Sequence, residues 1–191
     1  MSVLILILYG ISLLLFFLAL LWILIPALYG LPSKPTDPDR IRKALKLADL
    51  KQGETLYDLG AGDGRVLMIA AREFGVKAVG VEIAPVQFVL IWLKINFGGL
   101  RDRVQIKLKN FYSTELKDVD VVFIYATSRE VKNLAPYLKR KMKPGARLVS
   151  ISADFPDWEP SFFDEENLIF AYEMPPKEGS LTTYLLKNSE L

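Results

Sequence analysis

The sequence of 191 residues contains neither cysteine nor histidine. The absence of cysteine excludes disulfide bonds and a thiolate nucleophile, and it suits a reducing cytosol. The absence of both residue types excludes a histidine general base and the usual zinc sites, so we expect no metal centre. Any chemistry in this chain has to proceed without an imidazole or thiolate base.

Neither sign of charge dominates the chain. The 24 lysines and arginines are nearly balanced by 22 aspartates and glutamates, which leaves a formal net charge of +2. Such a balance gives little reason to expect nucleic acid as a partner. Charge is missing altogether from residues 3–29, and the first charged side chain is Lys34. The charged residues therefore belong to a soluble part that follows an uncharged N-terminal segment.

The uncharged segment is long enough to cross a membrane. As a helix it would measure about 40 Å at ~1.5 Å per residue, more than the ~30 Å hydrocarbon core requires. A secretory signal peptide is the alternative, but a basic start and a small-residue cleavage site are both missing. We expect a transmembrane anchor over residues 1–30, a proline-containing linker over 31–38 and one domain over 39–191.

Basic residues after the segment indicate its orientation. Met1 and Ser2 offer no lysine or arginine on the other side. The positive-inside rule therefore predicts a single-pass membrane protein with the large domain in the cytoplasm. The basic residues are Lys34, Arg40, Arg42, Lys43 and Lys46.

Strand-like and helix-like patterns alternate from the linker to residue 152, which predicts an α/β fold with an open sheet. Two further strands are expected at 167–173 and 180–187, as an antiparallel edge. Asp37 and Pro38 suit the start of the first helix of the domain. The other expected helices cover residues 64–74, 86–97 and 129–142, and the expected strands lie at 54–60, 77–82, 104–110, 118–127 and 146–152.

The helix expected over residues 86–97 is apolar almost all round. One interpretation is a helix buried between the sheet and other elements. The alternative is a helix that docks against the anchor, the bilayer or another subunit. The sequence leaves both open.

The stretch YDLGAGDGR, residues 57–65, combines a strand end, a glycine turn and a helix start. Glycine at alternate positions lets the backbone adopt positive φ and approach a ligand closely, and the helix start offers free N–H groups. Asp58 would repel a pyrophosphate, whereas it would attract the amino group of a methionine moiety.

Two later strand ends carry groups that suit a nucleoside. Glu82 ends the second strand, where its carboxylate can accept hydrogen bonds from both ribose hydroxyls. Asn110 ends the third strand, and its amide could bond an adenine edge while Phe111 stacks on the base. A nucleoside with a cationic tail fits this set best.

The stretches YDLGAGDGR, VGVEIAP and VVFIYAT resemble successive motifs of the seven-strand S-adenosylmethionine-dependent methyltransferases. The resemblance covers residues 35 to about 187. It implies a Rossmann-like seven-strand sheet and S-adenosylmethionine as cofactor. The implied cofactor-binding residues are Pro35, Thr36, Asp58, Gly60, Gly62, Asp63, Gly64, Glu82, Asn110 and Phe111.

A narrower resemblance rests on Pro35–Thr36, PYLKRKMKPGARLVS and FPDW at 155–158. These stretches are similar to the broad-specificity archaeal protein-lysine methyltransferases and to their mitochondrial relatives, which modify a lysine of the ATP synthase c subunit. The resemblance implies N-methylation of lysine side chains in a protein substrate. It also implies that Tyr125, Ser128 and Trp158 border the pocket for the target lysine.

Other functions stay open. The anchor and the apolar helix would also suit methylation of a lipid, a quinone or another membrane-associated small molecule. A membrane-tethered module that binds the cofactor without catalysis is a third interpretation, and a nicotinamide-dependent reductase is less favoured. YATS follows the fourth strand in place of NPPY or DPPY, which argues against methylation of DNA adenine or of glutamine.

Overall fold

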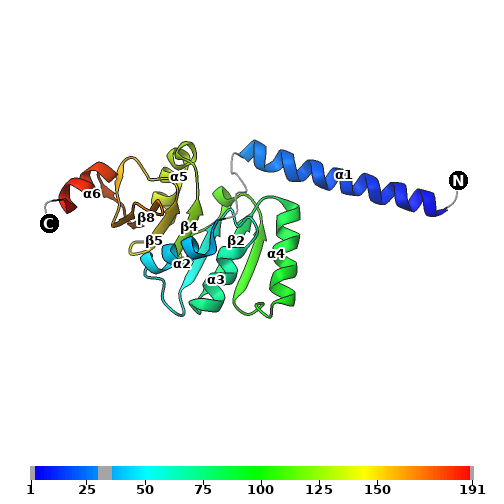
Figure 1. The fold of residues 1–191 in the computed structure, drawn as a ribbon, viewed down its shortest axis with the longest axis horizontal. Helices are drawn as coiled ribbons and strands as arrows, with labels where there is room; N and C mark the ends of the chain where they lie inside the picture. Colours follow the sequence, from blue (N-terminus) through cyan, green and yellow to red (C-terminus); the bar gives the residue numbers. More distant parts are fainter. Residues whose placement is uncertain (1–2, 30–35, 190–191) are drawn as a thin grey trace.

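The computed structural model describes residues 3–29 and 36–189. Helix α1 (Val3–Tyr29) extends away from the rest of the chain, which forms an α/β domain around one sheet (Figure 1). The domain helices are α2 (Pro38–Leu47), α3 (Arg65–Glu73), α4 (Pro85–Phe97), α5 (Ser128–Lys141) and α6 (Leu181–Asn188).

The sheet has seven strands in the order β3-β2-β1-β4-β5-β8-β7. The first five in this order are parallel, and β8 and β7 add an antiparallel edge. This arrangement confirms the predicted fold class. The strands are β1 (Thr55–Leu59), β2 (Lys77–Glu82), β3 (Val104–Leu108), β4 (Val121–Tyr125), β5 (Arg147–Ile151), β7 (Phe162–Asp164) and β8 (Ile169–Glu173), and β6 (Trp158–Glu159) pairs separately with β9 (Lys177–Glu178).

The hydrophobic core has two parts, one on each face of the sheet. Helices α2, α3 and α4 contribute to one part, and α5 packs on the other. Strand β4 serves both, because Val121 and Phe123 point into the first part and Val122 and Ile124 into the second. A strand covered on both faces needs a continuous apolar run, which explains the sequence of β4.

The start of α2 confirms the expected cap. The side chain of Asp37 accepts hydrogen bonds from the backbone N–H groups of Asp39 and Arg40, at 2.8 and 3.2 Å. Pro38 occupies the first helical position, where no N–H is needed.

The expected strand over residues 180–187 is wrong, because this segment forms helix α6. Ser180 caps the helix through a hydrogen bond from the Thr183 N–H to its hydroxyl oxygen. Leu181 and Tyr184 are partly buried and lie one turn apart, a helical spacing that the threonine-rich, strand-like composition obscured. The partner of β8 at the sheet edge is β7 instead.

The interpretation of residues 86–97 as a buried helix is also wrong. Helix α4 buries Gln87, Ile91 and Ile95, but its opposite side is exposed. The helix covers the end of the sheet near β2 and β3, and α1 contacts it without covering this outer side.

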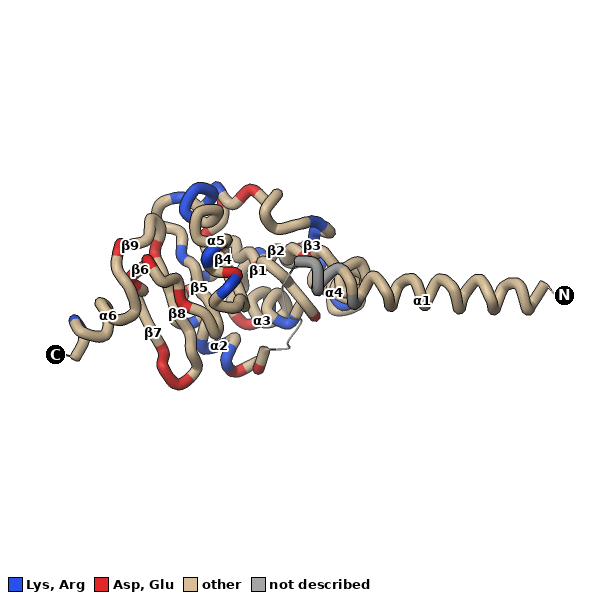
Figure 2. Tube along the Cα trace, turned by 90° about the horizontal axis from the view of Figure 1, so that it is seen from above, with Lys and Arg blue, Asp and Glu red and all other residues tan. Residues whose placement is uncertain are grey.

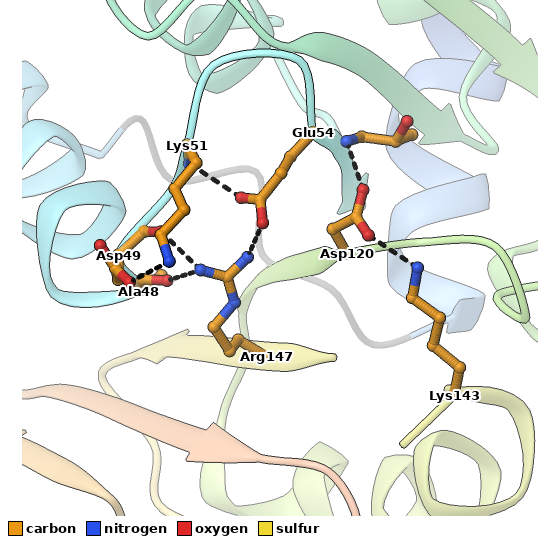
Figure 3. Close-up of polar contacts among 8 residues, drawn as sticks. Ala48, Asp49, Lys51, Glu54, Asp120, Lys143 and Arg147 are labelled. Carbon is orange, nitrogen blue, oxygen red and sulfur yellow. Dashed lines mark hydrogen bonds and ion pairs between the residues drawn. The ribbon is translucent and has the colours of Figure 1, made fainter. Parts of the chain in front are cut away.

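A polar cluster ties the amino ends of the strands together (Figure 3). The Arg147 guanidinium pairs with Glu54 and donates a hydrogen bond to the Ala48 carbonyl at 2.9 Å. The Asp120 carboxylate accepts hydrogen bonds from the Thr55 N–H at 2.8 Å and from Lys143 at 2.7 Å. These contacts occupy the amino ends of the strands and leave their carboxyl ends for a ligand.

Candidate functional site

A cavity of about 250 Å³ lies at the carboxyl ends of the parallel strands. Its lining includes Gly60 after β1, Glu82 at the end of β2, Asn110 after β3 and Tyr125 at the end of β4. Strands β1 and β4 are neighbours in the sheet, and the chain order runs outward from them in both directions. Open α/β sheets bind ligands at such a switch point.

The glycine turn between β1 and α3 forms the floor of the cavity. Gly60, Gly62 and Gly64 have φ angles of 96°, 56° and 80°, values that other residues rarely adopt. A Cβ atom on Gly64 would lie 2.9 Å from Cγ1 of Ile91, so α3 can begin this close to α4 only with glycine there. The turn is therefore fixed by backbone conformation as well as by packing.

Asp58 places a carboxyl group at the inner end of the cavity. The residue is 3% exposed, and its side chain has no hydrogen-bond partner among residues 3–29 and 36–189. Burial raises the pKa of Asp58 well above its usual value, and the neighbouring carboxylates of Glu82 and Asp63 raise it further. A cation bound beside Asp58 would restore its ionised form.

Glu82 is buried and faces the glycine turn. Its Oε2 atom accepts a hydrogen bond from the Gly62 N–H at 2.8 Å. Its Oε1 atom accepts two, from the N–H groups of Ile83 and Ala84, at 2.8 and 2.9 Å. A carboxylate offers about four acceptor positions, so capacity for a ligand hydroxyl remains on the side of Oε2.

Asn110 and Phe111 border the cavity at the end of β3. The Asn110 Oδ1 atom accepts a hydrogen bond from the Tyr112 N–H at 3.0 Å, while its side-chain nitrogen has no partner in the described part of the chain. The Tyr137 hydroxyl donates to the carbonyls of Phe111 and Thr114, at 2.6 and 2.8 Å, and holds this loop. Burial raises the pKa of Tyr137 to about 12, so the hydroxyl stays a donor.

The rim of the cavity joins the turn to the linker. Arg65 donates hydrogen bonds to the Asp63 carboxylate, the shortest at 2.6 Å, and to the Thr36 carbonyl at 2.6 Å. Lys94 donates to the Asp63 carbonyl at 2.7 Å. Burial alone would raise the pKa of Asp63, but the hydrogen bonds from Arg65 outweigh it and lower the pKa. Trp22 of α1 also lines this rim.

The sequence did not predict that Arg65, Lys94 or Trp22 would lie at the cavity; Trp22 was compatible only with the interfacial end of the anchor. Arg65 ends the glycine stretch, and its charge two residues after Asp63 was a usable indication of a paired turn. Lys94 and Trp22 reach the rim only through the placement of α4 and α1, for which the sequence carries no local pattern.

The structure brings most of the predicted site residues to one cavity. The residues that line it are Thr36, Asp58, Gly60, Gly62, Asp63, Glu82, Asn110, Phe111 and Tyr125. Gly64 lies beneath, as the N-terminal cap of α3. Pro35 lies outside the described residues.

Ser128 and Trp158 do not line this cavity. Ser128 is exposed at the start of α5. Trp158 is buried and stacks on Phe155, with ring centroids 4.4 Å apart, while its edge meets Tyr172. Its position is that of an aromatic cover over the sheet face, and its role toward a substrate stays a prediction.

The polar groups that line the cavity fit a cationic nucleoside. Asp58 supplies a buried carboxyl group that has no partner among the described residues, Glu82 a carboxylate with spare acceptor capacity, and Asn110 an amide next to an aromatic ring. Together with the glycine turn at the switch point, these groups define the class of protein as a methyltransferase with a Rossmann-like sheet.

Comparison with known proteins shows the family. The chain belongs to the ANTKMT methyltransferase domain family, whose model matches residues 58–162. A protein-lysine N-methyltransferase from Saccharolobus islandicus is 35% identical over 130 residues, which are 68% of this chain and 81% of that protein. The mouse adenine nucleotide translocase lysine N-methyltransferase is 27% identical over 137 residues, which are 71% of this chain and 59% of that protein.

A solved structure agrees with this assignment. An RNA methyltransferase from Salinibacter ruber, in complex with S-adenosyl-L-homocysteine, matches with a TM-score of 0.72 and 29% identity, over 76% of this chain and 97% of that chain. This match, together with the family, confirms the prediction of S-adenosylmethionine as cofactor.

Proposed function

We propose that the chain is a membrane-anchored methyltransferase that transfers a methyl group from S-adenosylmethionine to lysine side chains of a protein. The observation that carries the proposal is the cavity at the switch point, where Asp58, the glycine turn and Glu82 meet. The 35% identity to the Saccharolobus protein-lysine N-methyltransferase supports lysine as the acceptor.

Different residues of the cavity bind different parts of the cofactor. Gly60 and Gly62 permit close approach to the methionine part, and Asp58 balances its ammonium group. Glu82 accepts from the ribose hydroxyls, and the free amide hydrogens of Asn110 bond the base beside Phe111. The bound cofactor supplies an electrophilic methyl group.

The acceptor side of the cavity contains Tyr125, at the end of β4. With no histidine in the chain, the acceptor amine has to enter in its neutral form or lose its proton to water. Removal from water disfavours a charged amine, so exclusion of water from the cavity promotes the reactive form. The enzyme then contributes mainly alignment and exclusion of water. Ser128 and Trp158 remain predicted borders of the acceptor path.

Helix α1 is the proposed anchor. Its segment Val3–Trp22 is long and apolar enough to cross a membrane, and none of that window is buried against the domain. A cluster of basic residues begins at Lys34, which favours a cytoplasmic position for the domain. We assign residues 1–30 to the anchor, 31–38 to the linker and 39–191 to the methyltransferase domain.

Incubation of the full-length protein in lipid nanodiscs with methyl-labelled S-adenosylmethionine and a membrane extract tests the proposal. We expect label in protease-sensitive material and methyl-lysine on mass spectrometry of the digested proteins. Asp58→Asn is the control with weakened cofactor binding and reduced transfer, and Glu73→Gln, which changes an exposed carboxylate on α3, is the matched active control.

Other outcomes separate the rival functions. Label that extracts into organic solvent would identify a lipid or quinone acceptor and would refute the lysine assignment. Label sensitive to ribonuclease would point to RNA, the substrate class in the name of the Salinibacter protein. Binding of the cofactor without transfer to any fraction would indicate a non-catalytic module.

A further inference from the structure

The outer side of α4 is an exposed apolar surface. Its five large apolar side chains are between 36% and 87% exposed. Asn96, a polar residue between them, donates its side-chain amide to the Trp92 carbonyl of its own helix. We call this surface the α4 face, and it consists of Val89, Leu90, Trp92, Leu93 and Phe97.

The α4 face has a composition that water does not favour. Helix α4 contains no acidic residue, and its one basic residue, Lys94, directs its ammonium group to the Asp63 carbonyl at the cavity rim. A surface helix normally turns polar side chains outward, whereas α4 is apolar on both its inner and outer sides. An exposed patch of this kind marks a contact with another apolar phase.

The length of the apolar span of α1 indicates where the boundary of a bilayer would lie relative to the domain. The candidate span, Val3–Trp22, has 20 residues and therefore measures about 30 Å at ~1.5 Å per residue, the thickness of the hydrocarbon core. A hydrocarbon core that begins at Val3 would end near Trp22, and the uncharged sequence continues beyond it to Ser33. Trp22 lines the same cavity rim as Leu90 and Lys94 of α4, and α1 contacts α4. The part of α4 around Leu90 and Lys94 thus lies at the depth of that boundary.

The two helices are oriented crosswise. In Figures 1 and 2, α1 leaves the domain at the end where α4 lies, and its axis runs across that of α4. If α1 stands along the membrane normal, α4 lies in the plane of the membrane surface. Interfacial helices adopt this position, with their apolar side ~5–10 Å into the boundary between headgroups and acyl chains.

We propose that the α4 face is embedded in the surface of the same bilayer that α1 spans, and that it holds the mouth of the cavity at the membrane. This inference rests on the membrane-spanning role proposed for α1. A second copy of the chain is the less suitable occupant, because it would have to approach α4 from the side on which α1 enters the bilayer.

The absence of cysteine allows a direct test with single-cysteine variants that carry the fluorophore NBD. Val89→Cys and Phe97→Cys report on the two ends of the α4 face, and Leu13→Cys reports on the α1 span. Leu186→Cys is the matched control, because it replaces an apolar side chain, 64% exposed, on α6 at the far end of the domain. The full-length variants are reconstituted into vesicles of phosphatidylcholine and phosphatidylglycerol, with or without bromine on the acyl chains.

We expect bromine to quench the labels at Val89 and Phe97 clearly, though less than the deeper label at Leu13, and to leave the label at Leu186 unchanged. Aqueous iodide should show the reverse order. Quenching at Leu13 with none at Val89 and Phe97 would overturn the inference while the anchor stands. Labels on α4 that are shielded from both quenchers would mean that protein covers the face, which also overturns it. Absent quenching at Leu13 would refute the anchor as well, whereas methyl transfer is measured separately.

Discussion

Replacing Asp58 by asparagine tests the role of the buried carboxyl group. In the ligand-free protein the pKa of Asp58 is raised by burial and by the nearby carboxylates of Glu82 and Asp63. An ammonium group bound beside it favours the ionised form and lowers the pKa again. Binding of S-adenosylmethionine should therefore release a proton from Asp58 at pH values between the ligand-bound and the ligand-free pKa.

The structure sets the size of the effect. The Asp58 carboxyl group is 3% exposed and lacks a protein partner in the described residues, so the ligand contributes its main compensating charge. Affinity should rise with pH by up to about tenfold per pH unit within this window, the limit for one released proton. A charge-assisted hydrogen bond contributes about 1.5–3 kcal/mol, so Asp58→Asn should weaken binding by about 10- to 150-fold.

Isothermal titration calorimetry in buffers of different ionisation enthalpy measures both quantities. Wild-type protein should show proton release and a pH-dependent Kd, and Asp58→Asn should show neither below neutral pH. The ligand-free stability gives a second check: ionising a buried carboxyl group destabilises the fold, so wild-type stability should fall as pH rises above about 3.9 toward the raised pKa, and the variant should lack this loss. A Kd that is independent of pH, or unchanged by the substitution, would refute the reasoning.

Three further substitutions probe the glycine turn and the polar cluster at the amino ends of the strands. In Glu82→Gln, an amide N–H₂ group would face the Gly62 N–H, which now donates a hydrogen bond to the carboxylate. Titration calorimetry should show an affinity for S-adenosylmethionine that is lower by about 10-fold or more, as expected for a lost hydrogen bond of ~1.5–3 kcal/mol. An affinity equal to that of the wild type would contradict the ribose assignment. Gly64→Ala should lower the thermal midpoint, because its Cβ would meet Ile91 at 2.9 Å in a left-handed backbone, whereas an unchanged midpoint would mean that α4 shifts freely. Burial tends to raise the pKa of Asp120, but hydrogen bonds from Lys143 and from the Thr55 N–H lower it overall, so its stabilisation is present above the unfolded pKa of about 3.9 and is lost as pH falls through the lower folded value. Urea unfolding of Asp120→Asn should thus show a deficit of about 1–3 kcal/mol at pH 7 that disappears in acid, and a deficit independent of pH would contradict this account.

The cofactor side of the site could be predicted from sequence because its chemistry is local. Asp58 and the glycines belong to one stretch, and Glu82 and Asn110 each follow a strand of clear apolar pattern. The parallel order of the strands then brings their carboxyl ends together without any further information. The structure places all of these groups around one cavity except Gly64, which lies beneath it.

The remaining features depend on tertiary arrangement. The apolar composition of α4 fitted a buried helix equally well, because periodicity cannot distinguish a helix covered by protein from one that faces a membrane. The strand-like composition of residues 180–187 was overridden by the Ser180 cap and by packing against β6. Trp158 follows β5 in sequence, but its stacking on Phe155 turns it into the core rather than toward the cavity.

The difference between the two sides of the cavity has a structural cause. On the cofactor side, register fixes the functional groups: Leu59 pairs with Val81, and Glu82 pairs with Leu108, so neighbouring strands end at the same level. A slip of one residue would turn Glu82 to the other face of the sheet and remove it from the cavity. No strand register fixes Trp22 and Lys94, which reach the rim of the cavity from α1 and α4. The groups that end the strands therefore follow from the pairing of the sheet, whereas Trp22 and Lys94 reach the cavity only through the packing of two helices, which is why sequence patterns identify the former and not the latter.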